Sequence, residues 1–142
     1  MLVRLMYASR AVPAVDAEEL HSLLRQCRIN NPKLGITGVL CFADRIFLQA
    51  LEGSRSAVNR VYQRIANDAR HHDVELLSYQ EIDERRFAGW AMGQVQMVGL
   101  NPALMLKYSA SAMLDPYAMP GRASMALFDD LVATASIACD RN

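Results

Sequence analysis

Residues 36–51 read ITGVLCFADRIFLQAL, two apolar runs rich in β-branched and aromatic side chains and interrupted only at residues 43–45. This pattern predicts a β-hairpin. In its second strand, Phe47, Gln49 and Leu51 point to one face, and the even-numbered residues, also apolar, point to the other. Both faces of the sheet therefore need cover.

The segments on either side of the hairpin alternate between strand and helix patterns. Asp16 is placed to cap a helix with Glu19, and this helix should end near Asn30, before Pro32. The other predicted elements are a strand over residues 1–7, a helix after Ser54 with apolar positions at Val58, Val61, Tyr62 and Ile65, and strands over Val74–Ile82 and Trp90–Val98. The order βαββαββ predicts an α+β, ferredoxin-like sheet with both helices on one face.

The C-terminal segment supplies cover for the other face. Residues 102–114 and an apolar stretch around Leu127 and Phe128, after Pro120, are predicted to form two helices. We expect a core over residues 1–98 and a helical extension over residues 99–142, together forming one structural domain.

Composition limits the partners and the location. Fifteen basic residues balance fifteen acidic ones, so there is no electrostatic footprint for nucleic acid, and weak self-repulsion permits oligomers. Cys27, Cys41 and Cys139 are odd in number and widely spaced, which favours a reducing, cytoplasmic location over a disulfide framework or a paired metal motif. The N-terminal segment has the pattern of neither a signal peptide nor a membrane span.

Two polar residues interrupt the predicted core. An unpaired Gln49 amide at the centre of an apolar strand would cost about 1–3 kcal/mol, so it requires a partner, either the backbone or a polar ligand. Tyr7 ends the first strand on the face of Val3 and Leu5, and taken alone it is a core tyrosine. Since the first and third strands of such a sheet are usually neighbours, we expect Tyr7 and Gln49 side by side beneath the helices.

Other polar or aromatic residues have ordinary structural explanations. Asn30 and Asn31 follow the first helix, where asparagine often ends a helix. Trp90 and Met92 are predicted on one face of the fifth strand, where packing explains them. His71 and His72 are expected on a charged turn and, as neighbours that diverge, they predict no metal site.

Four motifs, in order, resemble those of the BLUF family, the sensors of blue light using FAD. They are YAS (residues 7–9), NNPxxGITG (30–38), FLQxLEG (47–53) and RRFxxWxM (85–92). LKYS at residues 106–109 is similar to the C-terminal helical part of short members, so the likeness spans nearly the whole chain.

The resemblance implies non-covalent FAD between the two helices, above the sheet. It places Tyr7 and Gln49 at the reactive edge of the flavin and Asn31 on its ring carbonyl. Polar contacts to the ring, ribose or phosphates are implied for Asn30, Arg64, Arg70 and His71, and apolar contacts for Cys27, Leu40, Phe47 and Ile65.

The resemblance also implies a mechanism. Tyr7 gives an electron and a proton to photoexcited flavin through Gln49, whose amide is left rearranged, and Trp90 and Met92 carry the change onward. The signal is expected to reach a downstream protein through the C-terminal helices or the sheet surface, or to change a homo-oligomer, without catalysed turnover. The alternative is a ferredoxin-like interaction module without a cofactor. A phosphohydrolase would need an arginine-lined anion loop, and residues 8–15 offer only Arg10.

Overall fold

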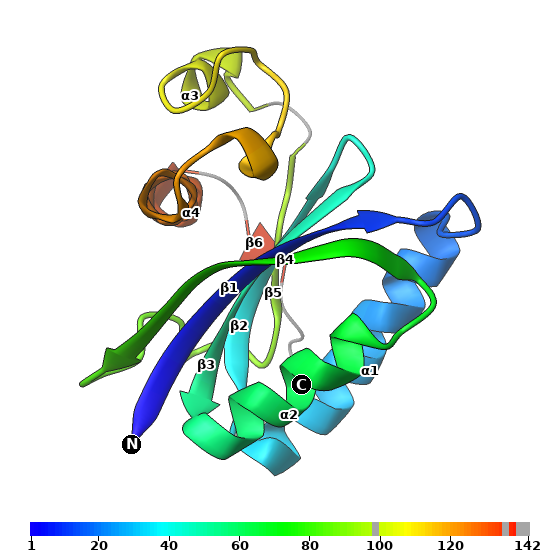
Figure 1. The fold of residues 1–142 in the computed structure, drawn as a ribbon, viewed down its shortest axis with the longest axis vertical. Coiled ribbons are helices and arrows are strands. Elements are labelled where there is room, and N and C mark those ends of the chain that lie inside the picture. The colour runs from blue at the N-terminus through cyan, green and yellow to red at the C-terminus, as the bar shows by residue number, and fades with distance from the viewer. Residues whose placement is uncertain (98–99, 135–136, 139–142) are drawn as a thin grey trace.

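The computed structural model describes residues 1–97, 100–134 and 137–138, and it shows a six-stranded sheet with helices on both faces (Figure 1). Val98 and Cys139, named above, lie outside the described residues. The elements are β1 (Leu2–Ala11), α1 (Ala17–Leu34), β2 (Thr37–Ala43), β3 (Ile46–Ser54), α2 (Arg55–Ala66), β4 (His71–Ile82), β5 (Gly93–Val95), α3 (Pro102–Leu106), a 3₁₀ helix (Pro116–Ala118), α4 (Gly121–Thr134) and β6 (Ile137–Ala138). The sheet order is β4-β1-β3-β2-β5-β6, with β2 and β5 parallel and the other neighbours antiparallel. The predicted ferredoxin-like α+β fold is confirmed.

The β2–β3 hairpin forms as predicted. Asp44 and Arg45 make its turn with φ values of 55° and 64°, the left-handed backbone that a tight two-residue hairpin turn requires. Gly38 permits close strand pairing, because a Cβ there would lie 2.2 Å from the carbonyl oxygen of Ala50. The hairpin thereby fixes the register of β3, the central strand that carries Gln49.

The first helix begins as predicted and ends later. The Glu19 amide donates to Asp16 Oδ1 at 2.8 Å, but α1 continues through Pro32 to Leu34. The expected end near Asn30 is wrong because a proline in the last turn removes only one backbone donor, while Gly35 supplies the left-handed cap (φ 67°). The extra turn keeps Asn31 in helical geometry, facing the sheet.

The core is divided by the sheet into two clusters. The front cluster lies beneath α1 and α2 and includes Tyr7 and Leu51, whereas the back cluster includes Leu48 and the α4 residues Leu127 and Phe128. Figure 1 shows α1 and α2 on one side of the sheet and α3 and α4 on the other. The alternation predicted for β3 and the predicted cover of both faces are confirmed.

Several predicted boundaries are wrong. The fifth strand is only Gly93–Val95, and β6, which was not predicted, pairs with it. The helix expected over residues 102–114 ends at Leu106, because Leu114 instead turns into the back cluster and its amide donates to Asp44 Oδ2 at 3.1 Å.

His71 and His72 are also misplaced by the sequence pattern, since they begin β4 rather than occupy a turn. Across the described part of the chain, no helix combines the length and the apolar character needed to cross a membrane.

Candidate functional site

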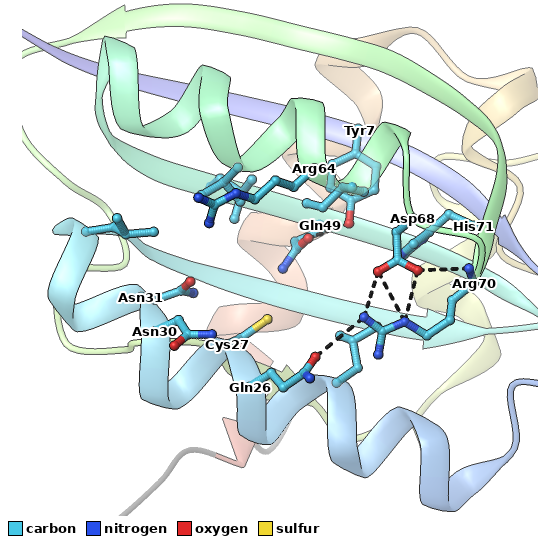
Figure 2. A pocket seen from close by; sticks show the side chains of 15 residues that line it. Tyr7, Gln26, Cys27, Asn30, Asn31, Gln49, Arg64, Asp68, Arg70 and His71 are labelled. Atoms are coloured by element: carbon cyan, nitrogen blue, oxygen red, sulfur yellow. Dashed lines mark hydrogen bonds and ion pairs between the residues drawn. The ribbon is translucent and has the colours of Figure 1, made fainter.

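A cavity of about 210 Å³ lies between α1, α2 and the front face of the sheet (Figure 2). Tyr7, Gln49 and Leu51 project into it from the strands. The rest of its lining comes from α1, α2, the segment that follows α2 and the first residue of β4: Leu23, Gln26, Cys27, Asn30, Asn31, Leu34, Val61, Arg64, Ile65, Asp68, Arg70 and His71. The site thus combines a buried polar floor with walls that are partly apolar.

Tyr7 and Gln49 are paired directly across β1 and β3, as expected. The Tyr7 hydroxyl donates a short hydrogen bond to Gln49 Oε1, and the two side chains are buried. Gln49 Nε2 in turn donates to the Met92 sulfur at 3.2 Å. The floor of the cavity therefore carries a directed chain of hydrogen bonds from Tyr7 through Gln49 to Met92.

The Tyr7 phenol is protonated, because removal from water raises its pKa well above the usual value of 10. In the structure the amide oxygen of Gln49 faces this hydroxyl, which leaves the amide N–H groups for other acceptors. A thioether sulfur is a weak acceptor, so the bond to Met92 is the more easily exchanged of the two.

Two α1 side chains bind the backbone that carries Met92. Asn31 Nδ2 donates to the Ala91 carbonyl at 2.7 Å, and Arg28 Nε donates to the Met92 carbonyl at 3.1 Å. Asn31 is buried, whereas Asn30 is exposed at the cavity rim. An amide has two N–H donors and an oxygen acceptor, so the described bond to Ala91 leaves Asn31 with groups for a ligand in the cavity.

The end of the cavity near β4 is charged. Arg70 forms ion pairs with Asp68 (2.6 Å) and Glu19 (3.3 Å), and Arg70 Nη2 donates to Gln26 Oε1 at 3.5 Å. Hydrogen bonds from Arg70 lower the pKa of Asp68. The two acidic partners offset the arginine charge, so its described contacts hold α1 against the segment that follows α2.

His71 and Cys27 are largely buried beside this charged end. His71 Nδ1 lies 2.7 Å from Ser9 Oγ, and burial lowers the pKa of the imidazole from 6.5. Burial likewise raises the pKa of the Cys27 thiol to about 11. Both side chains are therefore neutral parts of the lining near pH 7.

The structure brings together nine of the eleven side chains expected at the cofactor: Tyr7, Cys27, Asn30, Asn31, Gln49, Arg64, Ile65, Arg70 and His71. Leu40 and Phe47 are buried beneath the cavity, in the front cluster, and do not line it.

The sequence-based search missed Leu23, Gln26, Leu34, Leu51, Val61 and Asp68. Most of them had a periodic signal. Leu23, Cys27, Asn31 and Leu34 recur at helical spacing, Val61 precedes Ile65 by one turn, and Leu51 alternates with Gln49. Asp68 follows α2 in no regular pattern.

Alternation along the fifth strand predicted Trp90 and Met92 on one face, and this prediction is wrong. Both precede β5, and they belong to opposite sides of the sheet. Met92 is fully buried beside Gln49, whereas Trp90 packs on the back cluster and stacks on Phe87 with ring centroids 6.2 Å apart. The reason is that residues 83–92 form a loop, in which strand alternation does not apply.

Comparisons with known proteins identify the family to which the chain is similar. A family model described as sensors of blue light using FAD matches residues 2–93. A photoactivated adenylate cyclase subunit beta from Euglena longa is 34% identical over 92 residues, which cover 64% of this chain and 11% of the relative. A blue light- and temperature-regulated antirepressor from Escherichia coli is 29% identical over 61% of this chain and 22% of its own length. The chain thus spans about a tenth to a fifth of these curated relatives.

A solved structure of similar length shows the same fold. It is described as the BlsA photo-activated state and matches with a TM-score of 0.87 at 28% identity, over 100% of each chain. The likeness therefore includes the C-terminal helices as well as the region covered by the family model.

Proposed function

This chain belongs to the BLUF family of blue-light flavin photoreceptors, and we propose that it holds FAD non-covalently in the cavity between α1 and α2. The observation that carries the proposal is the chain of hydrogen bonds from Tyr7 through Gln49 to Met92 at the cavity floor. When bound, the flavin supplies absorption of blue light and acts as an electron acceptor.

The size of the cavity fits one part of such a ligand. Pockets that enclose a whole drug-sized molecule usually measure about 300–1,000 Å³, whereas this one encloses about 210 Å³. The cavity would therefore enclose the flavin ring system, and Asn30 and Arg64, which are exposed at the open rim, would hold the ribose and phosphates. The Arg64 side chain has no hydrogen bond or ion pair with another described residue, so its guanidinium is available to bind a phosphate.

Tyr7 is the electron and proton donor in this proposal. Because burial raises its pKa, the phenol keeps its proton until the electron is lost. The only described hydrogen bond of the hydroxyl goes to Gln49 Oε1, so the proton would leave along the amide, and the electron and the proton would both return to Tyr7 when the flavin is reoxidised.

Gln49 is the switching residue. Its Nε2 donates to a weak sulfur acceptor, so a rearranged amide that donates to a flavin carbonyl would differ little in energy from the arrangement in the structure. A changed hydrogen bond to that carbonyl would shift the flavin absorption slightly to the red.

The signal leaves the cavity through Met92 and Trp90. Met92 contacts Gln49 on the front face, and Trp90 packs against the back cluster with α4, so the loop links the two sides of the sheet. We propose residues 1–98 as the light-sensing core and residues 99–142 as the output surface, which signals in the cytoplasm to a partner protein or a second copy, without catalysed turnover.

An absorption spectrum recorded before, during and after blue illumination tests this function. We expect a flavin spectrum that shifts slightly to the red and recovers in darkness, and chromatography of the released cofactor should identify FAD rather than FMN. A spectrum that only bleaches would refute the Tyr7–Gln49 mechanism. No visible absorption after refolding with FAD would refute flavin binding and favour an interaction module.

A further inference from the structure

Glu52 is a fully buried carboxylate on β3, three residues after Gln49. Its Oε2 accepts hydrogen bonds from Arg4 Nε (2.9 Å) and Nη2 (2.7 Å) and from the amide of Arg86 (2.9 Å), and its Oε1 accepts from the amide of Phe87 (2.7 Å). Two of these four donors belong to the backbone of the loop between β4 and β5. The carboxylate thus joins the strand of Gln49 to the loop of Trp90 and Met92.

The loop is connected from this point to both Trp90 and α4. The Trp90 ring stacks on Phe87 with 15° between the planes, and the Trp90 amide donates to the Phe87 carbonyl at 3.1 Å. The Arg86 side chain reaches Asp129 on α4 at 2.7 Å. The two residues whose amides bind Glu52 therefore also connect the loop to its surroundings: Phe87 contacts the Trp90 indole, and Arg86 contacts α4.

The far end of the loop is held independently. Asn31 and Arg28 bind the carbonyl groups of Ala91 and Met92, and Gln49 binds the Met92 sulfur. The segment 86–92 is thus held at its start by Glu52, at its end by α1 and Gln49, and between them by the Gly38 amide, which donates to the Trp90 carbonyl at 3.1 Å. While its start is held, a displacement of Met92 cannot be absorbed by movement of residues 86 and 87.

Stability alone does not require an ionic group here. Taking a carboxylate out of water is costly, and buried ion pairs can often be replaced by apolar residues of similar volume with no loss of stability. The carboxylate supplies two acceptor oxygens that bind two adjacent amides, and an apolar residue cannot do this. These two hydrogen bonds set the position of the loop along β3.

We propose that Glu52 is a positioning residue for signal output: it anchors residues 86 and 87, so that a rearrangement at Gln49 and Met92 moves Trp90 instead of relaxing within the loop. This inference rests on the proposed light-driven rearrangement of Gln49. Glu52 does not line the flavin cavity, so it acts on transmission and leaves the photochemistry unchanged.

The test compares two optical signals in the FAD-loaded protein. The flavin red shift reports the Tyr7–Gln49 chemistry, and tryptophan emission reports Trp90, since the chain has one tryptophan. In Glu52→Gln, we expect a wild-type red shift, but the light-minus-dark change in tryptophan emission should fall to less than half. Hydrogen exchange at the Phe87 amide should accelerate about tenfold, because its charged acceptor is lost.

Arg85→Ala is the matched control. Arg85 lies in the same loop and binds Thr37 Oγ1 (3.0 Å) and the backbone oxygen of Glu52 (3.4 Å), but it does not contact the carboxylate. It should therefore retain the emission change. An equal loss in this variant would overturn the proposal, because the effect would then belong to the loop in general.

Two further measurements keep the test decisive if Glu52→Gln folds poorly. Arg4→Met combined with Glu52→Gln removes the buried charge together with its counter-ion and should show the same loss of emission change. In the wild type, the Arg86 and Phe87 amides should exchange more slowly than their loop neighbours, and exchange at the rate of exposed amides would overturn the proposal.

A missing red shift in the wild type would refute the photoreceptor function, whereas a normal shift with an unchanged emission response in Glu52→Gln refutes only the role of Glu52.

Discussion

The hydrogen bond between Tyr7 and Gln49 predicts a specific energetic coupling. Tyr7→Phe leaves Gln49 Oε1 without its donor, and Gln49→Leu leaves the Tyr7 hydroxyl without its acceptor. The two side chains are 1% and 3% exposed, so water replaces the missing partner only in part. Each single variant should therefore lower the free energy of unfolding by about 1–3 kcal/mol, the cost of an unsatisfied buried polar group.

The double variant should cost less than the sum of the two single ones. With both partners removed, no orphaned group remains in the Tyr7–Gln49 pair, and the coupling energy should be about 1–3 kcal/mol. Urea unfolding of all four proteins measures it. The series should be repeated at several FAD concentrations, because a change in flavin affinity would otherwise contribute to the apparent stability.

The optical outcome must agree with the energetic one. All three variants should bind flavin yet show no reversible red shift, since each breaks the path from the phenol to the amide. Energies that add to within about 0.3–0.5 kcal/mol would show that the two groups do not interact and would refute the hydrogen-bonded floor. A normal red shift in Tyr7→Phe would refute the donor role even if the coupling were found.

Two other variants test the cavity wall and the output. In Asp68→Asn, loss of the ion pair with Arg70 should cost at most about 1 kcal/mol at pH 7, because the pair is partly exposed. Because the folded-state pKa of Asp68 is lowered, the ion pair stabilises the fold above the unfolded-state pKa of about 4, and this stabilisation is lost as the pH falls through the folded-state pKa. The difference in free energy of unfolding between Asp68→Asn and the wild type, measured by urea unfolding, should therefore disappear in acid. A difference that does not change with pH would contradict the assignment. Trp90→Ala should keep the red shift but lose the light-dependent change in partner binding or oligomeric state, measured by size-exclusion chromatography with light scattering; a wild-type response would place the output elsewhere.

The fold was predictable wherever local chemistry and global packing agree. The apolar pattern of residues 36–51, the Asp16 cap and the alternation on β3 each act over a few residues, and each is confirmed. Prediction failed where another interaction outweighs the residue pattern. In α1 that interaction is local, because the Gly35 cap sustains one more turn beyond the end that Pro32 indicated. At Leu114 it is tertiary, because this residue binds Asp44 instead of continuing the predicted helix.

The candidate site was predictable from its polar exceptions and less so from its apolar walls. Gln49 and Tyr7 were identified because an amide and a phenol in a core each need a partner, and the strand register joins them. The opposite placement of Trp90 and Met92 was not predictable, because it follows from a loop whose course is set by Glu52 and by α1.

The weakness of the Met92 acceptor explains how one amide can serve two states. In the resting arrangement Gln49 has one strong partner, the Tyr7 hydroxyl, and one weak partner, the thioether sulfur. A carbonyl in place of that sulfur would stabilise the resting state by about 1 kcal/mol, the net worth of an ordinary hydrogen bond, and would lower the population of a rearranged state several-fold. Conversely, an amide without any second partner would leave a buried N–H unsatisfied and would not hold one dark-state orientation. Methionine satisfies both requirements, so the proposed rearrangement of Gln49 would affect the loop that Glu52 binds as well as the flavin.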